Sequence, residues 1–86
     1  MDKQAIGLAK RAHLATLRAM ELRSFGRIQE AREFEAKAQD AVRSMERDFG
    51  IPRSAAETVL TYTETGCEWE EIESDVEAIV AEGGAV

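Results

Sequence analysis

Apolar side chains return every three or four residues along most of the chain, the spacing that places them on one face of an α-helix. The pattern is clearest from about residue 27 to residue 49, where charged side chains occupy the opposite face. The apolar positions of this stretch are Ala31, Phe34, Ala38, Ala41, Val42, Met45 and Phe49. This periodicity predicts an amphipathic helix with its apolar face, Phe34 included, packed on the rest of the protein.

The stretch from residue 3 to residue 23 also has a helical period, but small side chains form the centre of its apolar stripe. These are Ala5, Ala9, Ala12, Thr16 and Ala19. Small residues allow neighbouring helices to approach closely. Leu14 and Leu17 lie outside the stripe, roughly 100° or more around the helix axis from its middle. We therefore expect this helix to have apolar contacts on more than one side.

Helix-breaking residues divide the chain into four such segments. Gly26, the Gly50-Ile51-Pro52 stretch and Thr65-Gly66 interrupt the pattern, and Gly83-Gly84 ends it. A third helix is expected from Pro52, or from a capping box of Ser54 and Glu57, to about residue 64. Residues 58–63 also have the composition of a strand, but a lone strand would find no partner in this chain. A fourth helix is expected over residues 68–82, with Trp69, Ile72, Val76, Ile79 and Val80 on its apolar side.

These segments predict an all-α protein. The two long helices, joined by a short connection, form an antiparallel αα-hairpin, and the two shorter helices complete a small bundle. We expect residues 1–82 to form a single helical domain and residues 83–86 to form a flexible tail. A core built from 86 residues is thin, so self-association would add useful buried apolar area.

Charge is distributed unevenly along the chain. Residues 51–86 contain nine Asp or Glu and a single cation, Arg53, for a net charge of −8, whereas residues 1–50 carry +2. Such asymmetry points to interactions with partners rather than to a reaction. The sequence has no run of about 18 apolar residues and no uninterrupted apolar leader, so we expect a cytoplasmic protein that does not enter membranes.

Few side chains suggest chemistry. His13 is the only histidine and Cys67 the only cysteine, and we expect both to be packed side chains rather than catalytic groups or ligands. The spacings of a phosphate-binding loop, a calcium loop and a dinuclear carboxylate site do not occur in the sequence. We therefore expect no enzymatic activity, no metal and no cofactor.

The leading hypothesis is a module that binds another protein, as an adaptor or an inhibitor, through the acidic fourth helix. The residues expected to contact a basic partner surface are Glu70, Glu71, Glu73, Glu77 and Glu82. If the partner is a nucleic-acid-binding machine, these carboxylates would occupy its phosphate groove, as expected of a phage-encoded anti-defence protein that mimics DNA.

Two other interpretations stay open. Cations of the first fifty residues could bind nucleic acid directly, although interleaved acids dilute every basic stripe; they are Lys3, Lys10, Arg11, Arg18, Arg27, Arg32, Arg43 and Arg47. Alternatively, the protein is a structural subunit that self-associates. Under each of these three interpretations we expect a homodimer through Leu14 and Leu17, unless the third or fourth helix covers these two leucines.

Overall fold

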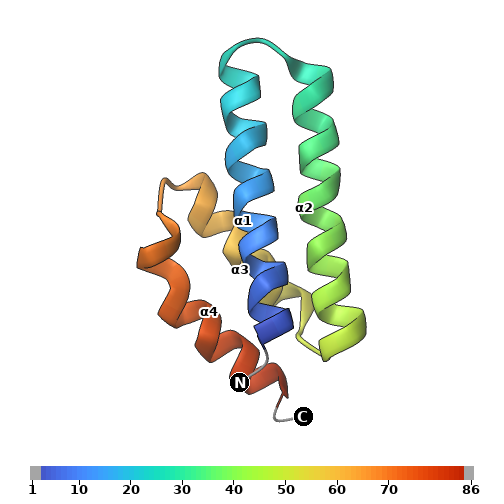
Figure 1. The fold of residues 1–86 in the computed structure, drawn as a ribbon, viewed down its shortest axis with the longest axis vertical. Helices are drawn as coiled ribbons and strands as arrows, with labels where there is room; N and C mark the ends of the chain where they lie inside the picture. Colours follow the sequence, from blue (N-terminus) through green and yellow to red (C-terminus); the bar gives the residue numbers. More distant parts are fainter. Residues whose placement is uncertain (1–2, 85–86) are drawn as a thin grey trace.

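The computed structural model describes residues 3–84, and over that range it contains four α-helices and no strand (Figure 1). The long helices α1 (Lys3–Ser24) and α2 (Ile28–Phe49) are followed by the shorter α3 (Arg53–Glu64) and α4 (Trp69–Gly84). The prediction of an all-α bundle built on an antiparallel hairpin is therefore confirmed. Residues 58–63 lie within α3, so they form a helix and not a strand.

Helices α1 and α3 each contact all of the other three helices, and α1 is the centre of the bundle because its contacts, above all those with α2, are the more extensive. Figure 1 shows α2 alongside it, α3 crossing behind the hairpin and α4 on the flank opposite α2. The end of the hairpin near the α1–α2 turn extends beyond α3 and α4 in the same view, which gives the molecule extents of 42 × 24 × 19 Å. The expected contacts on several sides of α1 are thus confirmed.

The joint between α2 and α3 follows from a glycine and an apolar residue. Gly50 adopts a left-handed conformation with φ of 66°, which costs a glycine nothing. Its N–H donates to the carbonyl of Glu46, and the N–H of Ile51 donates to the carbonyl of Met45, so two carbonyls at the end of α2 keep hydrogen-bond partners. Ile51 is then buried in the core, and Pro52 caps the start of α3 without a side-chain hydrogen bond. Ser54 therefore does not act as an N-cap.

The core has two parts. The larger cluster lies where all four helices meet and includes Val42, Met45, Val59, Ile72 and Val76, all at most 2% exposed. The smaller cluster lies in the protruding half of the hairpin and consists of Ala19, Leu22 and Ala31, with Phe34 packed against it. Phe34 is half-buried rather than enclosed, because its side chain lines an open groove between α1 and α2.

Helix α4 continues through Gly83 and Gly84 instead of ending near residue 82. Gly83 is buried against Ile51, and a Cβ atom at this position would lie 2.7 Å from Ile51 Cγ1. The glycine is therefore a close-packing residue and not the start of a tail. Of the tail expected at 83–86, residues 85 and 86 lie outside the described range.

A buried polar junction fixes the beginning of α4 against α1 and α3. Thr63 Oγ1 donates its hydrogen to the Val59 carbonyl at 2.8 Å, so it accepts the hydrogen bond from His13 Nδ1 at 2.7 Å. The neutral imidazole therefore carries its proton on Nδ1. The Trp69 ring packs on the other side of His13, with 5.7 Å between ring centroids. One residue from each of α1, α3 and α4 thus meets at this point.

The charge state of His13 matters because its ring is only 2% exposed. Burial lowers the pKa of His13 below its ordinary value; the carboxylate of Glu70 opposes that change, and the ammonium of Lys10 adds to it. His13 is consequently neutral at pH 7. A neutral imidazole can make the hydrogen bond to Thr63 without a counter-charge beside it.

Replacing Met45 should destabilise the protein more than replacing Phe34. Met45 is fully buried in the larger cluster, so Met45→Ala should lower the free energy of unfolding by about 2–5 kcal/mol through lost contacts and a cavity. Phe34→Ala removes a larger but half-exposed side chain and should cost less. Urea denaturation of both variants measures the difference; a greater loss in Phe34→Ala would place the stability centre in the protruding half of the hairpin.

Acid should weaken the fold through His13. Because the folded-state pKa of His13 is below its unfolded value of about 6.5, the unfolded chain binds more protons between these two values. The stabilising contribution is full above about pH 6.5 and falls as the pH drops through the folded pKa. Urea denaturation at several pH values from about 7.5 to 5.5 measures this loss. His13→Gln, which does not titrate there, is the control; an equal slope in both proteins would contradict the role of His13.

Candidate partner-binding surface

Helix α4 lies on α1 and α3 through one apolar side, which leaves its carboxylates on the outside. Trp69, Ile72, Val76 and Val80 are buried. The outward carboxylates, called the acidic face below, are those of Glu70, Glu71, Glu73, Asp75, Glu77 and Glu82; Glu77 is half-buried and the others are exposed. The five acidic residues expected from the sequence thus share one surface. Asp75 belongs to the same surface and was not among them.

The acidic face consists of two rows along the helix. Spacings of three, four and seven residues place Glu70, Glu73 and Glu77 in one row of the outward surface. The other row consists of Glu71, Asp75 and Glu82. Small exposed residues lie between the rows, namely Ser74, Ala78 and Ala81. A partner can therefore approach the helix backbone closely while meeting carboxylates on both sides.

Two of the carboxylates are held in place by hydrogen bonds. Glu73 Oε2 accepts a hydrogen bond of 2.8 Å from the indole Nε1 of Trp69. Glu71 Oε1 accepts one of 3.0 Å from the backbone N–H of Glu68, the returning half of a capping box. Negative charge in this first turn also interacts favourably with the helix dipole. The beginning of the acidic face is therefore ordered on a rigid element.

The ion pairs of the molecule lie elsewhere. Between the described residues there are six, and every one joins residues of α1, α2, α3 or the turn between α1 and α2: Arg18–Glu21, Arg23–Glu35, Arg27–Glu30, Arg43–Asp40, Arg47–Asp48 and Arg53–Glu57. Within residues 3–84 the acidic face has no Lys, Arg or His nitrogen within 4.0 Å of its carboxylates. Its charge is therefore not neutralised by local pairs.

The ion pairs of α1 and α2 also weaken the case for nucleic-acid binding through the first fifty residues. Four of the cations considered for that role, Arg18, Arg27, Arg43 and Arg47, each have a carboxylate within hydrogen-bonding reach. Exposed pairs of this kind contribute little to stability, but they cancel much of the local positive potential that would attract phosphate.

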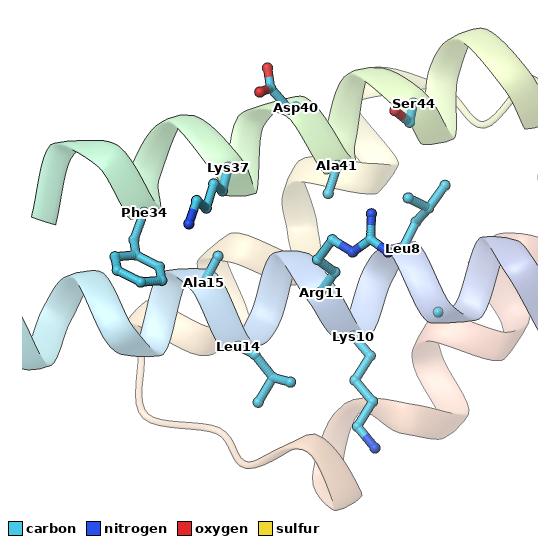
Figure 2. A pocket seen from close by; sticks show the side chains of 11 residues that line it. Leu8, Lys10, Arg11, Leu14, Ala15, Phe34, Lys37, Asp40, Ala41 and Ser44 are labelled. Carbon is cyan, nitrogen blue, oxygen red and sulfur yellow. The ribbon is translucent and has the colours of Figure 1, made fainter. Parts of the chain in front are cut away.

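Leu14 and Leu17 are 53% and 39% exposed, so within one chain neither α3 nor α4 encloses them. The two leucines belong to different surroundings. Leu14 lies at the edge of a groove between α1 and α2 (Figure 2), whereas Leu17 lies beyond it. The dimer expected through these residues stays a prediction.

The groove between α1 and α2 was not anticipated from the sequence. Its apolar surface comes from Leu8, Leu14 and Phe34, with alanines between them, and its basic side chains are Lys10, Arg11 and Lys37. In Figure 2 Phe34 and Lys37 point from α2 toward α1, while Arg11 points from α1 toward α2. Lys37 Nζ lies 4.5 Å from the centre of the Phe34 ring. The groove combines residues distant in sequence, so only the register between the helices reveals it.

The two side chains with potential chemistry, Cys67 and His13, are engaged in packing and hydrogen bonding within the fold. Cys67 is half-buried against the larger core cluster, with its sulfur 3.8 Å from Thr65 Oγ1, and His13 is committed to Thr63. Among the described residues no group of three or more His, Cys, Asp or Glu side chains is placed to hold a metal ion. No helix within residues 3–84 combines the length and the apolar content needed to cross a bilayer.

Comparison with known proteins adds no family to this description. The chain matches no protein-family model, no curated protein and no solved structure. Functional inference therefore starts from its own surfaces.

Proposed function

We propose that this protein is a non-enzymatic protein-binding module, an adaptor or an inhibitor, that contacts a basic surface of its partner through the acidic face of α4. The observation that carries the proposal is the separation between this face and the ion pairs. Six arginines pair with acids elsewhere, while the carboxylates of the acidic face have no cation in contact within the described chain. A basic partner would relieve their mutual repulsion.

A partner that handles nucleic acid fits the spacing of these charges. From Glu70 to Glu82 the helix rises about 18 Å, so the six carboxylates have a mean axial spacing of about 3.6 Å, with single steps from about 1.5 to about 7.5 Å. Phosphates along one strand of DNA rise about 3.4 Å each along the duplex axis. In this version the protein is an inhibitor that occupies the phosphate groove of its partner.

Charge reversal tests the acidic face. A variant with Glu70→Lys, Glu71→Lys and Glu77→Lys should lose its partner in quantitative affinity capture from the source cell while keeping the helical circular dichroism spectrum. The matched control is Glu33→Lys, Glu46→Lys and Glu64→Lys, because these three acids are exposed and lie on α2 and α3. The control has the same change in net charge and should retain the partner.

Capture of the same proteins by both variants would show that the acidic face only keeps the protein soluble and does not bind the partner. Release of the captured partner by duplex DNA would support the nucleic-acid version, and release by salt alone would leave the partner as a basic protein of another kind. A gel shift of DNA by this protein alone at low salt would instead favour direct nucleic-acid binding.

Self-association is a second candidate property, favoured by the exposure of Leu14 and Leu17. We expect light scattering to give a mass above one chain at high protein concentration. Because neither leucine is enclosed by its own chain, the Leu14→Glu, Leu17→Glu variant should stay folded and have the mass of one chain. A wild-type mass of one chain at every concentration would exclude the dimer.

A further inference from the structure

The hairpin of α1 and α2 has two broad sides, and the bundle covers only one of them. Helix α3 crosses behind the hairpin, while the opposite side, which faces the viewer in Figure 1, has none of the helices of residues 3–84 over it. The groove described above lies on this uncovered side (Figure 2). A helix laid along it would complete there the kind of packing that α3 provides on the other side.

The surface of the groove suits a helix with apolar anchors. Leu8, Leu14 and Phe34 stand at its borders, and Ala15 and Ala41 form the shallow part between them. Large side chains around small ones create the holes into which residues of a neighbouring helix insert. Leu14, at 53% exposure, has the most apolar area left to bury.

The charges of the groove specify the sign of the partner. Lys10, Arg11 and Lys37 line it, and within the described chain none of them forms an ion pair. The acid at the groove, Asp40, pairs with Arg43 at 3.4 Å and points away from α1 in Figure 2. Lys10 points away from α2 in Figure 2, and its Nζ lies 6.0 Å from the centre of the Trp69 ring, so Arg11 and Lys37 are the cations directed into the groove. Two cations without an ion pair beside an apolar surface favour an occupant that is both apolar and acidic.

We propose that the groove between α1 and α2 binds an acidic amphipathic helix of another protein. Apolar residues of that helix, at the spacing of three and four positions, contact Leu8, Leu14 and Phe34, and its carboxylates meet Arg11 and Lys37. This surface is separate from the acidic face of α4 and takes a partner of the opposite charge, so it goes beyond the function proposed above.

A second copy of this chain is a poorer occupant. Its acidic helix is α4, whose large apolar side chains, Trp69, Ile72 and Val76 among them, are buried in its own core. Between the acidic rows α4 offers only small side chains. The exposed large apolar residues outside the groove, such as Met20 and Phe25, lie in the protruding half of the hairpin among arginines and not on an acidic helix.

The test uses fluorescently labelled synthetic peptides and the full-length protein. The probe is a peptide of roughly 18 residues, long enough to form a helix, with leucine at every third or fourth position and glutamate between. A peptide of the same composition in shuffled order and one with lysine in place of glutamate are the peptide controls. Fluorescence anisotropy should show saturable binding of the first peptide only, at protein concentrations where light scattering detects single chains.

Matched variants locate the site. Leu14→Glu and Lys37→Glu should each weaken binding of the peptide about tenfold or more. Leu17→Glu changes the same residue type on α1, and Arg32→Glu reverses an exposed charge on α2; neither residue lines the groove, and both variants should bind the peptide as the wild type does. The triple reversal on α4 should also leave peptide binding unchanged, which separates this proposal from the function assigned to the acidic face.

The proposal is overturned if the acidic peptide does not bind up to about millimolar concentration, or if the shuffled peptide binds equally well. It is also overturned if Leu17→Glu and Arg32→Glu weaken binding as much as the groove variants do. Labelled protein that binds its unlabelled copies through Leu14 while the peptide does not bind would make the second copy the occupant instead.

Discussion

The close approach of three helices to α1 is the constraint on which the rest of the structure depends. Ala5, Ala9 and Ala12 are fully buried and Ala19 nearly so, and side chains of this size leave room for α2, α3 and α4 around one central helix. A large residue in this arc would push one neighbour away. On the outer side of α1 the exposed Leu14 marks a surface that none of the four helices within residues 3–84 covers.

The position of α4 follows from this arrangement and determines where the negative charge lies. Apolar burial holds α4 on the flank of α1, and the junction of His13, Thr63 and Trp69 fixes its first turn in register. Once Trp69 faces His13, helical geometry directs the carboxylates outward in two rows. Five arginines of the hairpin already pair with carboxylates of the hairpin itself. Within the described chain the acidic face remains without local counter-charges, and this imbalance is the physical basis for the proposed partner.

Periodicity was enough to predict the helices, the hairpin and the multiple contacts of α1, because these depend on which positions are apolar. It was not enough where a residue's role depends on what lies opposite. Gly83 resembles a helix terminator in the sequence, yet it packs on Ile51 and α4 passes through it. Phe34 belongs to the apolar stripe but is only half-buried, since it lines the groove on the side of the hairpin that α3 does not cover. The acidic face was predictable because consecutive residues form it, whereas the groove combines residues from two helices.

The acidic face and the groove differ in the forces that would act on them. The large apolar residues of α4 are buried in the protein's own core. Binding through the acidic face therefore relies on charge, which salt screens over about 8 Å at physiological ionic strength. The groove offers Leu8, Leu14 and Phe34 besides its cations, and apolar burial is not screened in this way. An interaction that relies on charge alone associates rapidly and discriminates by sign, while one that also buries apolar area persists longer. A module with both surfaces on opposite sides of its central helix has the physical means to hold two partners by different forces, as an adaptor requires.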